Sequence, residues 1–428
     1  MKEITCFEDL KYRGLVYDTM GNIAEKLNNS KVNFYVGIDP TGNGSGLHIG
    51  HTMAILVCKH LQKYGHTPYI ILGGATSSLG DPSGRDSERP EISLEQIASN
   101  TKKIEAQVRH LLGDDVVILN NKDWMDKLNF VDFMRIMGKV VTVNQMLAKS
   151  SVKSRIEREQ GISLQEFNYA LVQGYDFLHM YREHGCTLEI GGQDQWSNIE
   201  IGVSAIHKKE QYDAMALTWP LVIDPTTGKK FGKTAEGKAV WLDPNLTSPY
   251  EMYQFFLNVD DENAEQLIKK FTLLDIDEIE LLISLHKEDP SKRMLQKQLA
   301  KEVVSMVHSE QDYKNAVISS KVLFGNVDKE TLCNIDDDSF EAVFNGVPTF
   351  SVNIIDFDDN GKFIDTMVAC GAFESKGSLR KLIQSNGVSM NGVKVSDVNM
   401  TLSQEDLIHG KYLLIKKGKK SNILIIAK

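Results

Sequence analysis

The stretch Tyr35-Val36-Gly37-Ile38-Asp39-Pro40-Thr41, followed by Leu47-His48-Ile49-Gly50-His51, has the pattern of a buried strand that leads into a helix. Two imidazoles at a helix start can hold phosphate oxygens, neutral or charged, aided by the free N–H groups and the dipole of the first turn. A distant stretch, Lys229-Lys230-Phe231-Gly232-Lys233-Thr234, can bring ammonium groups and a hydroxyl to the same phosphates. We therefore expect two cationic elements on opposite sides of one nucleotide, in an enzyme that splits ATP at the α-phosphate.

Residues 1–220 alternate short β-rich runs with helical periods. Buried strands are predicted over 31–38, 68–74 and 116–120, and helices over 47–64 and 94–112. This rhythm predicts an α/β fold, a Rossmann-like, doubly wound parallel sheet that binds ligands at the carboxyl ends of its strands. Asp39-Pro40 and Gly80-Asp81-Pro82-Ser83-Gly84 fall at two such ends.

The chain divides into four predicted parts. These are a catalytic domain over 1–245 with a helical insertion at about 129–180 and a mobile loop at 226–238, an all-α domain over 246–327, an acidic linker over 328–360, and a small α+β module over 361–428. The terminal part carries 11 Lys and Arg against 5 Asp and Glu, whereas the whole chain has a net charge of −10. A basic module on an acidic chain predicts local contact with a polyanion.

Composition limits the class of protein. With 42% hydrophobic and 25% charged residues, the chain has the composition of a soluble globular protein. No apolar run reaches transmembrane length, and the N-terminus lacks a signal-peptide pattern, so we expect a cytoplasmic protein without membrane contact. The five cysteines stand in no metal-ligand spacing, which predicts reduced thiols and no protein-held metal.

Taken together, the motifs resemble bacterial-type tyrosyl-tRNA synthetase, a class I aminoacyl-tRNA synthetase. Besides the two opening stretches, the resemblance rests on Gly73-Gly74-Ala75-Thr76, the Gly80–Gly84 loop, Gln173-Gly174-Tyr175-Asp176-Phe177, Gly191-Gly192-Gln193-Asp194-Gln195-Trp196, Trp241-Leu242-Asp243-Pro244 and Thr247-Ser248-Pro249-Tyr250. Each motif is weak alone, but their order and spacing match the family over nearly the whole chain.

The resemblance implies a tyrosine–tRNA ligase. Such an enzyme activates L-tyrosine with ATP, as its Mg²⁺ complex, to tyrosyl-adenylate and diphosphate, and then transfers tyrosyl to the 3′ end of tRNA(Tyr). The helical domain would bind the anticodon, and the terminal module would be an RNA-binding domain of the ribosomal-protein type. A homodimer formed through helices near Phe130–Val152 and no tightly bound cofactor are also implied.

The resemblance places the substrate tyrosine among six side chains. Tyr35 and Asp176 match the pair that reads the phenol hydroxyl, because a carboxylate can accept the phenolic proton while a second phenol donates in return. The ammonium group of the substrate is assigned to Asp81, Tyr169 and Gln173. Its carboxylate is assigned to Gln195. Tyr169, Gln173 and Asp176 follow at helical spacing, so one helix would line both ends of the amino acid.

The nucleotide is assigned to the two opening stretches and to further loops. The phosphate-binding residues implied by the resemblance are Thr41, His48, His51, Lys230, Lys233 and Thr234, with Arg85 and Arg89 from a second mobile loop. Other contacts to ATP are implied for Gly37, Asp39 and Gly50, and contacts to its ribose for Gly192 and Asp194. The reaction needs no acid–base residue, because the tyrosine carboxylate attacks the α-phosphorus in line and pyrophosphate leaves.

In the terminal module, Arg380 and Lys381 lie on a predicted helix and Lys394 in the following hairpin. Contact with RNA phosphates is the natural use of such residues, because it gives affinity with little sequence reading. A solvated basic face is the alternative interpretation.

Four departures from the family pattern are visible. The turn at Asn43-Gly44-Ser45-Gly46 is about two residues longer than usual, and Ala235-Glu236-Gly237-Lys238 is one residue longer. Gln193 replaces a small residue, and Glu189 stands where a neutral Gln is common. We expect shifted loops and an effect on ATP affinity rather than lost activity.

Two alternative functions stay open at this point. A tryptophan-specific sister enzyme shares the fold, although the Tyr35–Asp176 pair argues against it because an indole has no hydroxyl. A catalytically inactive RNA-binding paralogue would have no reason to keep the cationic set of His48, His51, Lys230 and Lys233.

Overall fold

The computed structural model describes residues 4–41, 46–83, 92–159, 161–223, 231–233, 237–324, 329–333, 335, 340–341, 343–344, 347–358, 361–418 and 421–428. The chain forms two compact units. One comprises Met1–Thr247 with Leu257–Val303, and the other Ser248–Phe256 with Val304–Lys428. The four-part division expected from the sequence stays a prediction.

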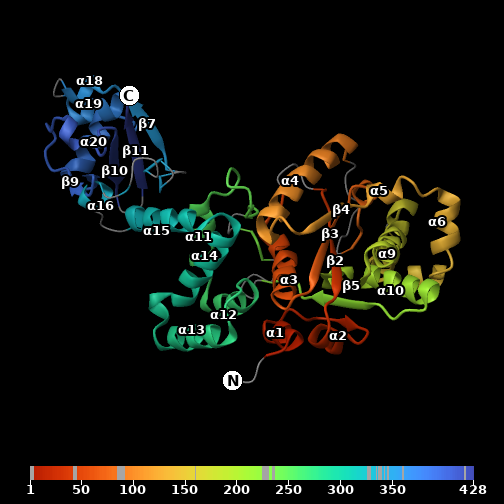
Figure 1. Cartoon of the computed structure of the whole chain (residues 1–428). Coiled ribbons are helices and arrows are strands. Elements are labelled where there is room, and N and C mark those ends of the chain that lie inside the picture. Colours follow the sequence, from red (N-terminus) through yellow and green to blue (C-terminus); the bar gives the residue numbers. More distant parts are fainter. Residues whose placement is uncertain are drawn as a thin grey trace. The chain divides into compact units, whose positions relative to one another are not determined.

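The first unit is built on a six-stranded sheet (Figure 1). Its strands are β1 (Thr19–Met20), β2 (Asn33–Ile38), β3 (Thr67–Leu72), β4 (Val117–Asn120), β5 (Cys186–Gly192) and β6 (Met215–Trp219). The order is β1-β6-β5-β2-β3-β4, with β1 antiparallel to β6 and the other neighbours parallel. The expected α/β fold is confirmed, and β1, β5 and β6 extend the sheet beyond the three predicted strands.

Helices cover both faces of this sheet, as a doubly wound fold requires. Figure 1 shows α3 (Thr52–Lys63) and α4 (Leu94–Leu112) on one side, and α9 (Leu164–His184) and α10 (Trp196–Glu210) on the other. A short 3-10 turn, η1 (Ile49–His51), leads into α3, whose residues are mostly buried. This buried helix fixes the position of the histidines at its start.

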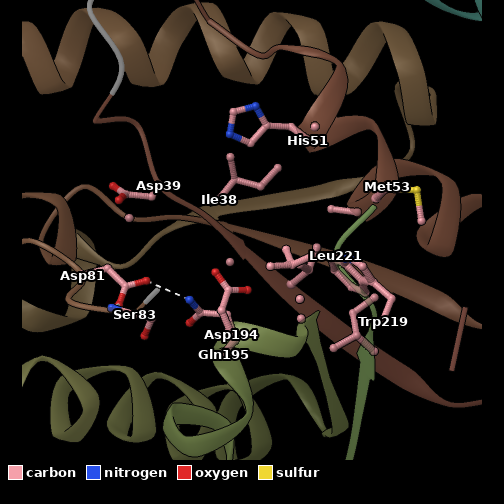
Figure 2. Close-up of a pocket in the computed structure, with 18 of the residues that line it drawn as sticks. Ile38, Asp39, His51, Met53, Asp81, Ser83, Asp194, Gln195, Trp219 and Leu221 are labelled. Atoms are coloured by element: carbon pink, nitrogen blue, oxygen red, sulfur yellow. Dashed lines mark hydrogen bonds between the residues drawn. The ribbon is translucent and has the colours of Figure 1, made fainter. Parts of the chain in front are cut away.

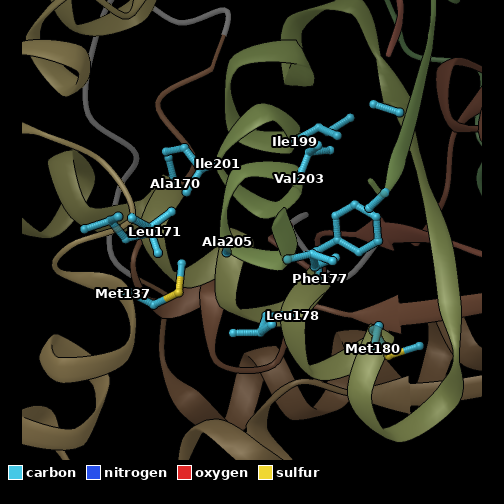
Figure 3. Packing of buried hydrophobic residues seen from close by; sticks show 14 of the residues in the cluster. Met137, Ala170, Leu171, Phe177, Leu178, Met180, Ile199, Ile201, Val203 and Ala205 are labelled. Carbon is cyan, nitrogen blue, oxygen red and sulfur yellow. The ribbon is translucent and has the colours of Figure 1, made fainter. Parts of the chain in front are cut away.

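Helices α9 and α10 pack unusually closely. A Cβ on Gly174 would lie 2.6 Å from Ile201 Cγ2, and a Cβ on Gly202 would lie 2.7 Å from Phe177 Cβ, so both positions need glycine. Around this contact lies a buried apolar cluster that includes Met137, Phe177 and Leu178 (Figure 3). The polar residues of α9 are therefore carried on a rigid support.

The remaining helices of this unit surround the sheet. They are α1 (Cys6–Tyr12), α2 (Ile23–Asn29), α5 (Lys122–Met125), α6 (Phe130–Met137), α7 (Val143–Leu147), α8 (Ser150–Glu157), α12 (Asp261–Lys270) and α13 (Ile276–Glu288), with the 3-10 turns η2 (Thr76–Ser78), η3 (Gln193–Gln195) and η4 (Pro290–Lys292). Buried Arg13 pairs with Asp9 at 2.7 Å and donates to the carbonyls of Lys269, Thr272 and Leu274. This arginine ties the α1 region to α12.

The second unit combines helices with a five-stranded sheet. Its elements are α11 (Pro249–Leu257), the end of α14 (Met294–Val307), α15 (Glu310–Phe324), α16 (Lys329–Cys333), β7 (Thr349–Val352), α18 (Ile355–Asp358), α19 (Phe363–Ala369), α20 (Lys376–Gln384), β8 (Val388–Met390), β9 (Val393–Lys394), η5 (Gln404–Asp406), β10 (Tyr412–Lys417) and β11 (Ser421–Ala427). The sheet order is β7-β11-β10-β8-β9, with only the β7–β11 pair parallel among the described strands.

The stretch 328–360, predicted as an acidic linker, contains described elements of the second unit. Strand β7 lies within that stretch and pairs with β11, and Phe340 stacks on Tyr412 with ring centroids 4.4 Å apart. Leu332 and Phe344 are buried in the same cluster. The acidic residues of this stretch suggested a linker, but its apolar residues belong to the core of the terminal module.

Among the described helices, none combines the length and apolar character needed to cross a bilayer.

Candidate active site

A cavity of about 610 Å³ opens at the carboxyl ends of β2, β3 and β5 (Figure 2). The sheet order reverses at this point, since β3 follows β2 on one side while β5 lies on the other. Figure 2 shows His51 on one side of the cavity and Asp194 and Gln195 on the other. The site therefore lies where the topology of the sheet predicts it.

Most of the residues predicted for tyrosine and ATP line this cavity: Tyr35, Gly37, Asp39, His48, Gly50, His51, Asp81, Tyr169, Gln173, Asp176, Gly192, Asp194, Gln195 and Lys233. Thr41 is not among the lining residues, and its hydroxyl donates to Asp39 at 3.0 Å. Four predicted residues, Lys230, Thr234, Arg85 and Arg89, lie outside the described residues.

Asp176 is a carboxyl buried at one end of the cavity. Trp124 Nε1 donates to its Oδ1 at 2.7 Å, and Asn121 Nδ2 donates to its Oδ2 at 3.0 Å. Burial raises the pKa of Asp176 to about 7, although both donors favour the charged form and oppose that rise. The group therefore titrates near neutral pH and keeps lone pairs for another donor.

Tyr35 lies beside Asp176 and faces a second buried carboxyl. In the register of β2 and β5, Tyr35 is paired with Glu189. Neither the Tyr35 hydroxyl nor Glu189 Oε2 has a hydrogen-bond partner among the described residues, although the two side chains are close enough to affect each other's pKa. Burial, followed by the nearby carboxyls, raises the pKa of Tyr35, so its phenol remains protonated.

A chain of amides runs from Asp81 to Glu189. Gln195 Nε2 donates to Asp81 Oδ2 at 2.8 Å, the contact dashed in Figure 2. Asn198 Nδ2 donates to the side-chain oxygens of Gln195 and Gln173, at 3.2 and 3.1 Å. Gln173 Nε2 in turn donates to Glu189 Oε1 at 3.0 Å. Both ends of the amino-acid pocket are thus joined through side chains.

The two histidines are held in one tautomer by backbone donors. Gly50 N–H donates to His48 Nδ1, and His48 N–H donates to His51 Nδ1, each at 3.1 Å. An Nδ1 that accepts a hydrogen bond carries no proton, so each neutral ring bears its proton on Nε2. The ring centroids lie 3.9 Å apart.

Of the two protonation states that the sequence leaves open for the histidines, burial favours the neutral one. Desolvation in the cavity wall lowers the pKa of His48 and lowers that of His51 to about 3. Both imidazoles are therefore neutral at pH 7 and can serve as Nε2–H donors rather than as cations.

Lys233 is brought to the histidines by backbone contacts. Val240 O accepts from Ile49 N–H at 2.8 Å, and Gly232 O accepts from Val240 N–H at 3.1 Å. At Gly232, φ is 117°, and a Cβ would lie 2.7 Å from Ile49 Cγ2, so only glycine fits. The charge of Lys233 contributes to the low pKa of His48. The two remote stretches therefore meet at one cavity.

Several residues that shape the site were not predicted from the sequence. Asn121 and Trp124 hold Asp176, and Asn198 joins Gln195 to Gln173. Asn121 follows β4 directly, so the rule that ligand loops follow strand ends could have found it. No such position in the sequence pattern indicates a role for Trp124 or Asn198.

Comparisons with known proteins agree with this geometry. Residues 27–325 match the family model of class I tRNA synthetases (W and Y), and residues 339–425 match the tyrosine–tRNA ligase SYY-like C-terminal domain. A tyrosine–tRNA ligase of Bacteroides thetaiotaomicron is 46% identical over 98% of this chain and 99% of its own length. One from Porphyromonas gingivalis is 44% identical over the same shares.

A solved structure supports the same assignment. The C-terminally truncated mitochondrial tyrosyl-tRNA synthetase of Aspergillus nidulans aligns with a TM-score of 0.68 at 28% identity. The alignment covers 76% of this chain and 95% of that one.

The hydrogen bond from Trp124 to Asp176 yields a stability prediction. Trp124→Phe removes a donor that favours the carboxylate, so the pKa of Asp176 rises further above 7. At pH 5.5 Asp176 is protonated in both proteins, and a neutral hydrogen bond of about 0.5–1.5 kcal/mol is lost. At pH 8.5 the lost bond is to a charged group, and we expect about 1.5–3 kcal/mol.

Urea unfolding at the two pH values measures this difference. Trp196→Phe, at a half-buried tryptophan of α10, is the control and should cost the same free energy at both pH values. A Trp124→Phe loss that does not grow with pH would contradict the role given to this contact.

Proposed function

The chain belongs to the class I tyrosyl-tRNA synthetases, and we propose how its cavity performs the two steps of a tyrosine–tRNA ligase. This ligase activates L-tyrosine with ATP to tyrosyl-adenylate and diphosphate, and then transfers the tyrosyl group to tRNA(Tyr). The observation that carries the residue assignment is the placement of Asp176 and Tyr35 in the same cavity as His48, His51 and Lys233.

In the proposed pocket, the substrate hydroxyl donates its proton to Asp176 and accepts one from Tyr35. Phenylalanine would leave the Tyr35 proton and the remaining lone pairs of Asp176 without a partner in a buried pocket, which costs free energy. In this enzyme class such a site rejects phenylalanine by about 10⁵-fold without editing, a value for the class rather than one obtained for this chain.

The other end of the amino acid would lie against Asp81, Tyr169 and Gln173, which bind its ammonium group. Asp81 is buried, and its Oδ1 accepts from Ser83 N–H at 2.9 Å. Gln195, now bound to Asp81, would be shared with the substrate carboxylate. These contacts hold that carboxylate in position for attack on the α-phosphorus.

On the nucleotide side, His48 and His51 would donate Nε2–H to phosphate oxygens, and Lys233 would supply positive charge. Donors fixed in this way stabilise the charge that moves to the leaving pyrophosphate. Gly192 and Asp194 would receive the ribose. Further phosphate contacts are proposed for Thr41, Lys230, Thr234, Arg85 and Arg89.

The proposed reaction also bears on the metal ion and on the cellular location. Mg²⁺ would enter as part of the ATP complex, since Mg²⁺ is commonly held by substrate phosphates with one or two carboxylates, and Asp194 lines the cavity. A cytoplasmic location is proposed because charged tRNA is consumed there.

The function is tested by tyrosine-dependent exchange of pyrophosphate into ATP without tRNA. We expect exchange with tyrosine and not with tryptophan. Asp176→Asn should lower discrimination between tyrosine and phenylalanine by about 10- to 100-fold, the free energy of a hydrogen bond to a charged group. The KM for ATP should change little, and exposed Asp123→Asn is the matched control.

No exchange with tyrosine would overturn the proposal, and exchange with tryptophan would support the sister enzyme. An equal loss of tyrosine and ATP binding in Asp176→Asn would refute the pocket assignment.

The terminal module would bind tRNA through an exposed basic face. Arg380 and Lys381 are exposed on α20, whose Leu379 and Ile383 are buried, and Lys394 is exposed on β9. Phosphate contacts of this kind give a salt-dependent affinity.

Reversing two of these charges separates the steps of the reaction. Arg380→Glu with Lys381→Glu should leave pyrophosphate exchange unchanged and lower tRNA charging by about tenfold or more, with a smaller salt dependence. Lys26→Glu with Lys31→Glu, an equal charge change at exposed positions of the first unit, is the control. Unchanged charging in the first double variant would favour the solvated-face interpretation.

We propose a homodimer through the helical insertion. Several apolar side chains are exposed on α6 and α7: Phe130 (77%), Val131 (63%), Met134 (42%), Val143 (66%) and Leu147 (41%). Exposed large apolar side chains on two successive helices are typical of association surfaces.

Phe130→Glu should convert the dimer to a monomer in sedimentation velocity experiments, because a carboxylate would be buried in the contact. Leu281→Glu, at a 60% exposed leucine of α13, is the control and should stay dimeric. A Phe130→Glu protein that still dimerises would place the interface elsewhere.

A further inference from the structure

Glu189 is a buried carboxyl without a role in the steps above. It is 2% exposed on β5 and faces Tyr35 on β2. Its Oε1 accepts from Gln173, but its Oε2 has no hydrogen-bond partner within the described part of the chain, and neither has the Tyr35 hydroxyl. Two unpaired oxygen atoms at neighbouring buried positions are costly, unless a proton is shared between them.

The protonation state of Glu189 decides where the single proton of Tyr35 points. A Glu189 carboxylate would draw that proton toward itself, because a charged acceptor is the stronger partner. Tyr35 would then offer only lone pairs to the substrate phenol. As the acid, Glu189 carries its proton on Oε2 and donates to the Tyr35 oxygen, which frees the Tyr35 proton for the substrate.

We propose that Glu189 is a positioning residue for tyrosine recognition: as a carboxylic acid it donates to the Tyr35 hydroxyl and turns the Tyr35 proton toward the phenol oxygen of bound tyrosine. This inference rests on the proposed function of the pocket. A neutral amide N–H at this position could donate in the same way, but the carboxylic acid differs from it because the acid loses its proton as pH rises.

The surroundings of Glu189 favour the acid at neutral pH. Burial raises its pKa to about 8, donation from Gln173 opposes this rise, and the charge of Asp176 on α9 adds to it. The β6 residue in register with Glu189 is apolar Ala216. Ionisation of Asp176 near pH 7 should raise tyrosine affinity, because a carboxylate is a better hydrogen-bond acceptor for the substrate hydroxyl than a carboxylic acid. Of the two buried carboxyls, only Glu189 should therefore lower tyrosine affinity as it loses its proton.

The test measures the Kd of L-tyrosine at pH 7 and pH 9 by equilibrium dialysis with the full chain. The wild-type Kd should weaken about tenfold more than that of Glu189→Gln, which is the limit for loss of one required proton. The ammonium group of tyrosine titrates equally with both proteins and cancels in this ratio. Glu183→Gln, at an exposed carboxyl of α9, should follow the wild type.

Tyr35→Phe provides a second variant should Glu189→Gln not fold. Because this variant has no hydroxyl to orient, its Kd for tyrosine should rise between pH 7 and pH 9 by about as little as that of Glu189→Gln. Equal pH dependence in wild type and Glu189→Gln, or full weakening in Tyr35→Phe, would overturn the positioning role. Absence of tyrosine binding at pH 7 in the wild type would instead refute the proposed function itself.

Discussion

Asp176 accepts hydrogen bonds from Trp124 and Asn121, and these contacts tie three parts of the chain to one buried carboxyl. Burying a carboxyl is unfavourable unless donors surround it, so α9, α5 and the residue after β4 must keep fixed positions. The glycine contacts between α9 and α10 hold the same helix from its other side. Amino-acid recognition at this site therefore depends on packing as much as on the groups that touch the substrate.

The parts of the fold that the sequence predicted are those with strong local patterns. Helix α4 has the predicted bounds, and β2, β3 and β4 lie within two residues of theirs. Strand β5 was not predicted because Thr187 and Glu189 interrupt its apolar residues and two glycines end it. Strand β7 was not predicted because acidic residues surround it in the sequence. Its partner β11 lies far along the chain, so no local pattern indicates the pairing.

The candidate site was also predicted only in part. Motifs in the family order identified most of the side chains that line the cavity, because ligand-binding loops follow strand ends. Their protonation could not be predicted, since it depends on burial and on backbone donors that only the folded chain supplies. His51, with a pKa of about 3, is a neutral donor for this reason. Asn198 was equally hidden, because its partners Gln195 and Gln173 come from separate elements.

The position of β7 bears on how the chain can be shortened. A protein ended at residue 360 would keep Thr349–Val352 and Phe340 but lose β11 and Tyr412, on which they pack. The remnant would present an unpaired strand edge and bare aromatic rings to solvent, a combination that promotes aggregation. A shortened form intended to stay in solution should therefore end before α16, so that the terminal module is removed as one piece.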